Sequence, residues 1–114
     1  KNIPVLGVCR GMQLMTTYFG GKIISVKNHV ATQHTLSIHT NGVMPLIEGE
    51  VVNSFHNFGI AKEHLKDFWI IATSEDGYVE AIAHKEHKMW GIMWHPERLP
   101  FSKTNLDLLK YCFK

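Results

Sequence analysis

The sequence from residue 3 to residue 11 reads IPVLGVCRG. The apolar run Ile3–Leu6 predicts a strand, and such a continuous run is typical of an inner strand of a parallel sheet with helices on both faces. Cys9 follows at a sharp turn, after which a helix is expected to begin. A strand, a turn with a cysteine at its apex and a helix form the arrangement that presents a nucleophile on a strained backbone. Gly7 and Gly11 are expected where a Cβ would crowd that turn.

A second short motif, Trp94-His95-Pro96-Glu97, follows a strand expected over residues 88–94. The carboxyl ends of parallel strands meet at one edge of a sheet, so Cys9 and His95 are expected close together. Cysteine, histidine and a carboxylate are the parts that a thiol hydrolase needs. Each motif alone also fits a plainer reading, in which Cys9 is a small buried residue and His95 is a loop histidine beside a solvated Glu97.

Composition limits the class of protein. The chain has 114 residues, 45% of them hydrophobic, which fits a globular domain or part of one. The net charge is +2 with acids and bases mixed, so no basic face for nucleic acid is expected. No apolar run approaches the roughly 20 residues that span a bilayer. Only Cys9 and Cys112 are present, which favours a reducing, cytoplasmic location, and Cys112 is expected in the core.

The remaining pattern predicts an α/β fold without internal repeats. The expected strands cover residues 1–8, 22–26, 33–39, 50–53, 68–74, 79–84 and 88–94. A loop is expected over residues 27–32, a turn at Asn41-Gly42, irregular structure over 54–60 and a helical turn over 62–65. The expected helices cover residues 11–19, with Met12, Met15 and Phe19 facing inward, and 105–113, with Leu106, Leu109 and Phe113 facing inward.

Taken together, Gly7–Gln13 and Trp94–Glu97 resemble the class I glutamine amidotransferase-like superfamily. The stretch Val52–Asn57, which reads VNSFHN, is similar to the γ-glutamyl hydrolase branch, peptidase family C26. Within that branch, residues 53–60 and 91–98 most resemble the γ-glutamyl-CDP-amidate hydrolases. The resemblance covers essentially all 114 residues. It implies a three-layer αβα, flavodoxin-like fold with a central, mostly parallel sheet. Residues 1–114 would be the C-terminal portion of one such domain.

The resemblance also implies roles for particular residues. Cys9 would be the nucleophile, His95 the general base and then acid, and Glu97 the residue that orients His95. The backbone N–H of Arg10 would stabilise the oxyanion. The substrate-binding residues would be Gln13, Ser54, Phe55 and His56. The residues preceding the nucleophile strand in this superfamily supply a second oxyanion donor, and the chain lacks them.

The histidines raise two questions, the role of His56 and the possibility of a metal site. His56 is either a second imidazole in the site or a packed loop residue, and the packed reading is favoured. Neither the pair His84 and His87 nor the pair His34 and His39 has acidic or cysteine neighbours at ligand spacing. We therefore expect neither a metal nor a cofactor.

The expected function is a cysteine-dependent amidohydrolase that cleaves a γ-glutamyl amide through a γ-glutamyl thioester. Its partner would be a small-molecule γ-glutamyl substrate, without nucleic acid or membrane. Two alternatives are a glutaminase component that delivers ammonia to a partner synthetase, and an inactive amidotransferase fold that serves as an interaction module.

Overall fold

A computed structural model describes residues 3–26, 30–39, 44–56, 58–60, 65–96 and 103–113. Glu97 lies outside these ranges, as do the expected turn at Asn41-Gly42 and residues 62–64 of the expected helical turn. The described part forms an α/β fold, as expected. Neither of its helices has the length and apolar character that a membrane crossing requires.

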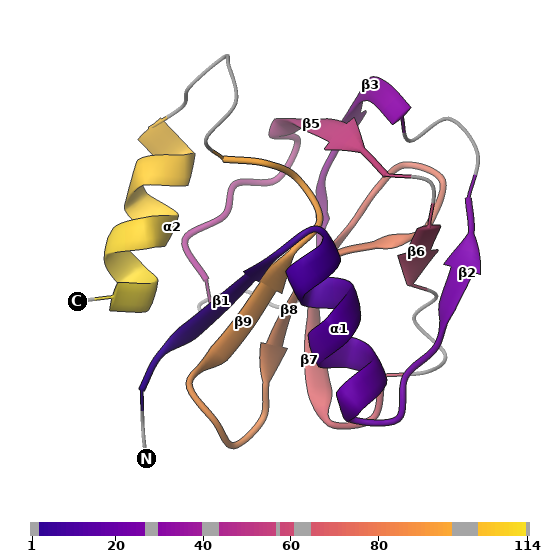
Figure 1. Cartoon of the computed structure of the whole chain (residues 1–114). Helices are drawn as coiled ribbons and strands as arrows, with labels where there is room; N and C mark the ends of the chain where they lie inside the picture. The colour runs from indigo at the N-terminus through magenta and orange to yellow at the C-terminus, as the bar shows by residue number, and fades with distance from the viewer. Residues whose placement is uncertain are drawn as a thin grey trace.

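A five-stranded sheet forms the centre of the molecule, in the order β1-β9-β8-β7-β4 (Figure 1). These strands are β1 (Val5–Val8), β9 (Met89–Ile92), β8 (Val79–His84), β7 (Phe68–Thr73) and β4 (Ser37–Ile38). β1 and β9 run parallel, and the other neighbours run antiparallel. The described sheet is therefore mixed rather than mostly parallel. β1 lies at its edge, where the sequence predicted an inner strand.

Two smaller ladders lie beside the central sheet. β2 (Ile23–Ser25) pairs with β6 (Phe58–Ile60), and β3 (Val30–Thr35) pairs with β5 (Val51–Phe55), all antiparallel. Three expectations were wrong here. The single strand over 33–39 is divided between β3 and β4, the loop over 27–32 enters β3 at Val30, and the irregular stretch 54–60 contains the end of β5 and all of β6.

Two helices cover opposite faces of the sheet, α1 (Arg10–Tyr18) and α2 (Lys103–Phe113) (Figure 1). Ile82 of β8 packs with the residues of α1, whereas its neighbours Ala81 and Ala83 pack with those of α2. This alternation is what a strand between two helical layers requires. The three layers of the expected fold are present.

The expected inner face of α1 is confirmed, and that of α2 was wrong. Met12 and Met15 are buried, and Phe19 packs against them. In α2 the buried residues are Asn105, Leu108 and Cys112, whereas Leu106 is 41% exposed and Phe113 53% exposed. The helix is thus rotated by about one residue from the expected orientation, because a buried asparagine takes part in the inward face. The core position of Cys112 is confirmed.

Glycines let α1 approach the sheet closely. A Cβ at Gly7 would lie 2.8 Å from the carbonyl carbon of Gly11, and one at Gly91 would lie 2.7 Å from Cγ of Met12. A Cβ at Gly11, in contrast, would meet no described atom within 4 Å. The steric expectation is therefore right for Gly7 and wrong for Gly11. Gly7 and Gly91 together set the position of the start of α1.

Candidate active site

Cys9 stands at the predicted turn between β1 and α1, and its backbone is strained. Its φ is 53° and its ψ is −102°, and no other non-glycine among the described residues has a positive φ. Its N–H donates to the carbonyl of Ile92 at 2.7 Å, and its carbonyl accepts the first helical bond from the N–H of Gln13 at 3.0 Å. Strain of this kind costs about 1–3 kcal/mol and persists where the surrounding structure enforces it.

The parallel pairing of β1 with β9 brings the two sequence motifs together. Val8 and Ile92 are register partners, so both strands end at the same edge of the sheet. Cys9 follows β1 directly, and His95 follows β9 after two further residues. The prediction that the two strands place Cys9 and His95 at one edge is confirmed.

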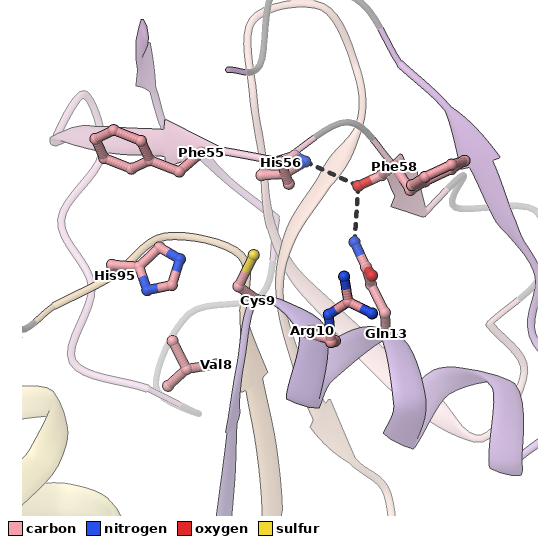
Figure 2. Close-up of a pocket in the computed structure, with 8 residues that line it drawn as sticks. All are labelled: Val8, Cys9, Arg10, Gln13, Phe55, His56, Phe58 and His95. Carbon is pink, nitrogen blue, oxygen red and sulfur yellow. Dashed lines mark hydrogen bonds between the residues drawn. The ribbon is translucent and has the colours of Figure 1, made fainter. Parts of the chain in front are cut away.

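A pocket of about 340 Å³ opens at this edge. The thiol of Cys9 and the imidazole of His95 both point into it (Figure 2). Eight residues line it: Val8, Cys9, Arg10, Gln13, Phe55, His56, Phe58 and His95. Of the eight residues that the sequence placed in the site, six therefore meet around one cavity. Ser54 does not line it, and Glu97 lies outside the described residues, so its place beside His95 stays a prediction.

The carbonyl of Phe58 anchors one side of the pocket. It accepts a hydrogen bond from Nε2 of Gln13 at 2.8 Å and lies 2.8 Å from Nδ1 of His56 (Figure 2). When Nδ1 carries the proton and donates to this carbonyl, Nε2 of His56 is left to accept from the Ser54 hydroxyl, 3.3 Å away. His56 is buried while still bordering the pocket. Its ring is thus held between two protein groups, which favours the packed reading over a second catalytic imidazole.

Phe55 and Arg10 complete the lining. The Phe55 ring lies edge-on to the His95 ring, with centroids 6.1 Å apart and an angle of 69° between the planes. Arg10 is exposed at the start of α1. The first backbone bond of the helix is made by the N–H of Gln13, so the N–H of Arg10 is not used within the helix. It is a backbone donor next to the thiol.

Sequence reasoning missed Asn53 and Phe58. The Asn53 side chain makes two hydrogen bonds with the backbone of His95: Nδ2 donates to the carbonyl at 2.9 Å, and Oδ1 accepts from the N–H at 2.8 Å. Asn53 stands inside the motif VNSFHN, but its partner is 42 positions away in the chain. Only the three-dimensional neighbourhood of β5 and the end of β9 could reveal this contact.

The two cysteines differ in their surroundings. Burial raises the pKa of the Cys112 thiol to about 12, which keeps it protonated and unreactive near neutral pH. Cys9 borders the pocket, whereas Cys112 lies on the buried face of α2 and packs in the core. Across the described ranges, no cluster of three or more histidine, cysteine, aspartate or glutamate side chains could hold a metal ion.

Comparison with known proteins identifies the family of the chain. The model of the peptidase C26 family matches residues 1–97. A γ-glutamyl-CDP-amidate hydrolase from Campylobacter jejuni is 35% identical over 113 residues, which are 99% of this chain and 52% of that protein. An anthranilate synthase component 2 from Cyanophora paradoxa is 36% identical over 103 residues, 87% of this chain and 54% of that protein.

A solved structure has a similar fold. A glutamine amidotransferase from Thermotoga maritima superposes with a TM-score of 0.68 at 19% identity, over 82% of this chain and 40% of that one. The chain spans about half the length of the two curated relatives. The strained turn at Cys9 between β1 and α1, which we call the elbow, and the α/β sheet fit the family whose model matches residues 1–97. The chain belongs to the peptidase C26 family within the class I glutamine amidotransferase-like superfamily.

Proposed function

We propose that the protein containing this chain hydrolyses γ-glutamyl amide bonds through a thioester on Cys9. One observation carries the proposal: the strained elbow at Cys9 and the imidazole of His95 face one pocket, because β1 and β9 are parallel neighbours. A cysteine and a histidine so arranged can form an activated nucleophile with its general base. The family match supports the same chemistry.

The reaction uses His95 twice. Cys9 Sγ attacks the γ-carbonyl carbon, and His95 takes the thiol proton. The tetrahedral intermediate collapses when His95 gives this proton to the leaving nitrogen, which breaks the C–N bond and leaves a γ-glutamyl thioester. A water molecule then attacks the thioester while His95 takes a proton from it, and glutamate leaves as the Cys9 thiol is restored. Glu97 orients His95 in this scheme.

The oxyanion of the intermediate is stabilised by the backbone N–H of Arg10. This N–H belongs to the first turn of α1 and is not used within the helix. The positive end of the helix dipole adds to its effect on a negative oxygen.

Gln13 and the segment Ser54–His56 bind the glutamyl head group. Gln13, Phe55 and His56 border the pocket around Cys9, which supports this role. Ser54 is fully buried, so its contribution comes through the backbone and through its contact with His56. A zwitterionic head group needs both donors and acceptors, and backbone near a pocket offers both.

A second oxyanion donor comes from polypeptide beyond these 114 residues. The curated relatives are about twice as long as the matched part. β1, which carries the elbow, ends the described sheet with an apolar groove beside it. Removal of one oxyanion donor typically lowers the rate by about 10²–10³. Residues 1–114 are thus the C-terminal portion of one amidotransferase-like domain in this proposal.

The test compares two cysteine variants of the protein purified with all the sequence that its gene encodes. Glutamate release is measured from glutamine and from a panel of γ-glutamyl amides; γ-glutamyl-CDP-amidate belongs in the panel because of the named relative. We expect Cys9→Ala to abolish release and Cys112→Ala, at the buried thiol, to retain it. Equal release from the wild type and Cys9→Ala would refute the assignment.

A second candidate function is ammonia delivery to a synthetase partner. The similarity to an anthranilate synthase component 2 favours it. The chemistry at Cys9 is the same, but glutaminase activity would rise severalfold when the synthetase is added. Co-purification with a synthetase would support this version, whereas full activity without a partner would favour the hydrolase. An inactive interaction module is the remaining alternative, and catalytic turnover would exclude it.

A further inference from the structure

The side-chain amide of Asn53 holds the backbone of His95 like a neighbouring strand. Its Nδ2 donates to the His95 carbonyl at 2.9 Å, and its Oδ1 accepts from the His95 N–H at 2.8 Å. β9 ends at Ile92, so His95 lies beyond the last residue of the sheet ladder. Asn53 belongs to β5, in a different ladder. The Asn53 amide therefore bonds both the N–H and the carbonyl of His95, a residue that lies beyond the end of β9.

The residues between β9 and His95 are fixed by other elements. The N–H of Met93 donates to the carbonyl of Glu80 in β8 at 2.8 Å. Nε1 of the fully buried Trp94 donates to Oδ1 of Asn105 in α2 at 2.9 Å. The successive residues 93, 94 and 95 are thus anchored to β8, α2 and β5 in turn. The anchor of His95 is the last of these, and the Asn53 side chain makes both of its hydrogen bonds.

We propose that Asn53 is a positioning residue for His95, an inference that rests on the catalytic role of His95 proposed above. The two hydrogen bonds fix the backbone of His95 and so the direction in which its imidazole leaves the chain toward Cys9. Asn53 does not border the pocket, whereas Phe55 and His56 of the same segment do. Asn53 acts through His95 and not through a contact with the substrate.

The geometry separates this role from a role in substrate binding. A displacement of about 1 Å in a catalytic group can lower the rate on the order of 10²-fold. Asn53→Ala is therefore expected to lower kcat by about 10- to 100-fold, while KM changes little because the pocket lining is retained. If Asn53 instead shaped the substrate-binding segment, KM would rise and kcat would stay near the wild-type value.

Asn53→Asp gives a second test, because its effect on kcat should depend on whether the new carboxyl group is protonated. An ionised aspartate still accepts from the His95 N–H, but its second oxygen faces the His95 carbonyl, where a donor is needed. A protonated aspartate restores one donor and one acceptor. The ratio of kcat for Asn53→Asp to that of the wild type should rise as the pH falls from 8 toward about 5, whereas the corresponding ratio for Asn53→Ala stays flat.

Gln33→Glu is the matched control. Gln33 is the exposed register partner of Asn53 across the β3–β5 ladder. The same change from amide to carboxylate there adds the same charge on the neighbouring strand, outside the hydrogen-bonded pair of Asn53 and His95. Its kcat should stay within about twofold of the wild type, since surface charges have small effects.

The variants are compared in the protein with all its encoded sequence, with glutamate release as the assay. Equal pH dependence of Asn53→Asp and Asn53→Ala, or a loss confined to KM, would overturn the positioning role. Hydrogen exchange at the backbone amide of His95 provides a measure that needs no activity: Asn53→Ala should speed it by tenfold or more. Unchanged exchange would refute the proposal even if the enzyme is active. If Asn53→Ala speeds exchange in a protein that releases no glutamate, the hydrogen bonds from Asn53 to the His95 backbone are supported and the proposed function is refuted instead.

Discussion

At the scale of single residues, the sequence predicted the groups that carry chemistry better than the groups that support them. Cys9 and His95 could be placed because glycine, a following helix and a strand end leave a pattern in the sequence. Asn53 and the carbonyl of Phe58 could not, since Asn53 bonds to His95 and the Phe58 carbonyl bonds to Gln13 across more than 40 positions of the chain, and hydrogen bonds leave no periodic signal. The plainer reading of Cys9 as a small buried residue does not explain why its backbone carries positive φ.

Glu80 is a buried carboxyl in the middle of the sheet. Burial, together with the negative charges of Asp76 and Glu75, raises its pKa from the ordinary glutamate value of 4.5 to about 8. Between these two pH values the folded protein keeps a proton on Glu80 that the unfolded chain releases. The free energy of unfolding therefore falls as the pH rises from about 4.5 to about 8, and it levels off above.

Glu80→Gln should remove this dependence, because the amide resembles the protonated carboxyl in shape and cannot ionise. We expect the variant to gain stability over the wild type between pH 5 and pH 8.5, on the order of a few kcal/mol. Urea unfolding at the two pH values measures the difference. A stability difference between variant and wild type that is the same at both values would show that Glu80 does not stay protonated in the fold.

At the scale of elements, the strands with strong hydrophobic patterns could be predicted. β7, β8 and β9 lie within one or two residues of the expected bounds. The errors fall where polar residues are buried. Ser54 is fully buried in β5, which is why residues 54–60 gave no strand signal. Asn105 is turned inward by its bond to Trp94, so the leucine pattern indicated the wrong face of α2.

The close approach of α1 to β1 is tested by two glycines of the same motif. Gly7→Ala places a Cβ 2.8–2.9 Å from the backbone of Gly11 and Met12, which cannot yield as a flexible side chain would. We expect a loss of about 1–3 kcal/mol in the free energy of unfolding. Gly11→Ala meets no described atom within 4 Å and lies in a helix, so it should be neutral or stabilising by up to about 1 kcal/mol.

Urea unfolding, followed by circular dichroism, measures the free energy of unfolding of the two glycine variants. Equal stabilities for Gly7→Ala and Gly11→Ala would mean that α1 does not begin against β1 as described. Glutamate release gives a second reading, because a shifted start of α1 also moves Cys9 and the N–H of Arg10.

At the scale of the whole molecule, one side of the described sheet is open. β1 forms its edge, and a groove of about 460 Å³ runs between β1 and α1. Val5, Leu14 and Tyr18 border it and are 42%, 72% and 82% exposed. The apolar run Ile3–Leu6 indicated a strand buried on both sides. In our proposal, further polypeptide of this protein covers the groove. It corresponds to the part of the relatives that lies outside the matched residues.

Cysteine labelling tests whether the groove is covered. In a Cys9→Ala background, Leu14→Cys should react slowly with a hydrophilic thiol reagent when the protein carries all its encoded sequence. Phe113→Cys on α2 is the matched control, since Phe113 is also more than half exposed, at 53%. It should react at least about tenfold faster, because local protection suppresses such reactions. Equal rates at the two positions would contradict a covered groove.

The central claim is that Cys9 is the nucleophile of a γ-glutamyl amide hydrolase. The most direct measurement is labelling of the protein, with all its encoded sequence, by an electrophilic glutamine analogue that carries a reactive ketone at the γ position. Peptide mass spectrometry then locates the adduct. We predict one adduct on Cys9, its loss in the presence of excess γ-glutamyl substrate, and none on the buried Cys112. An unlabelled Cys9, or labelling of Cys9 that substrate does not slow, would contradict the account.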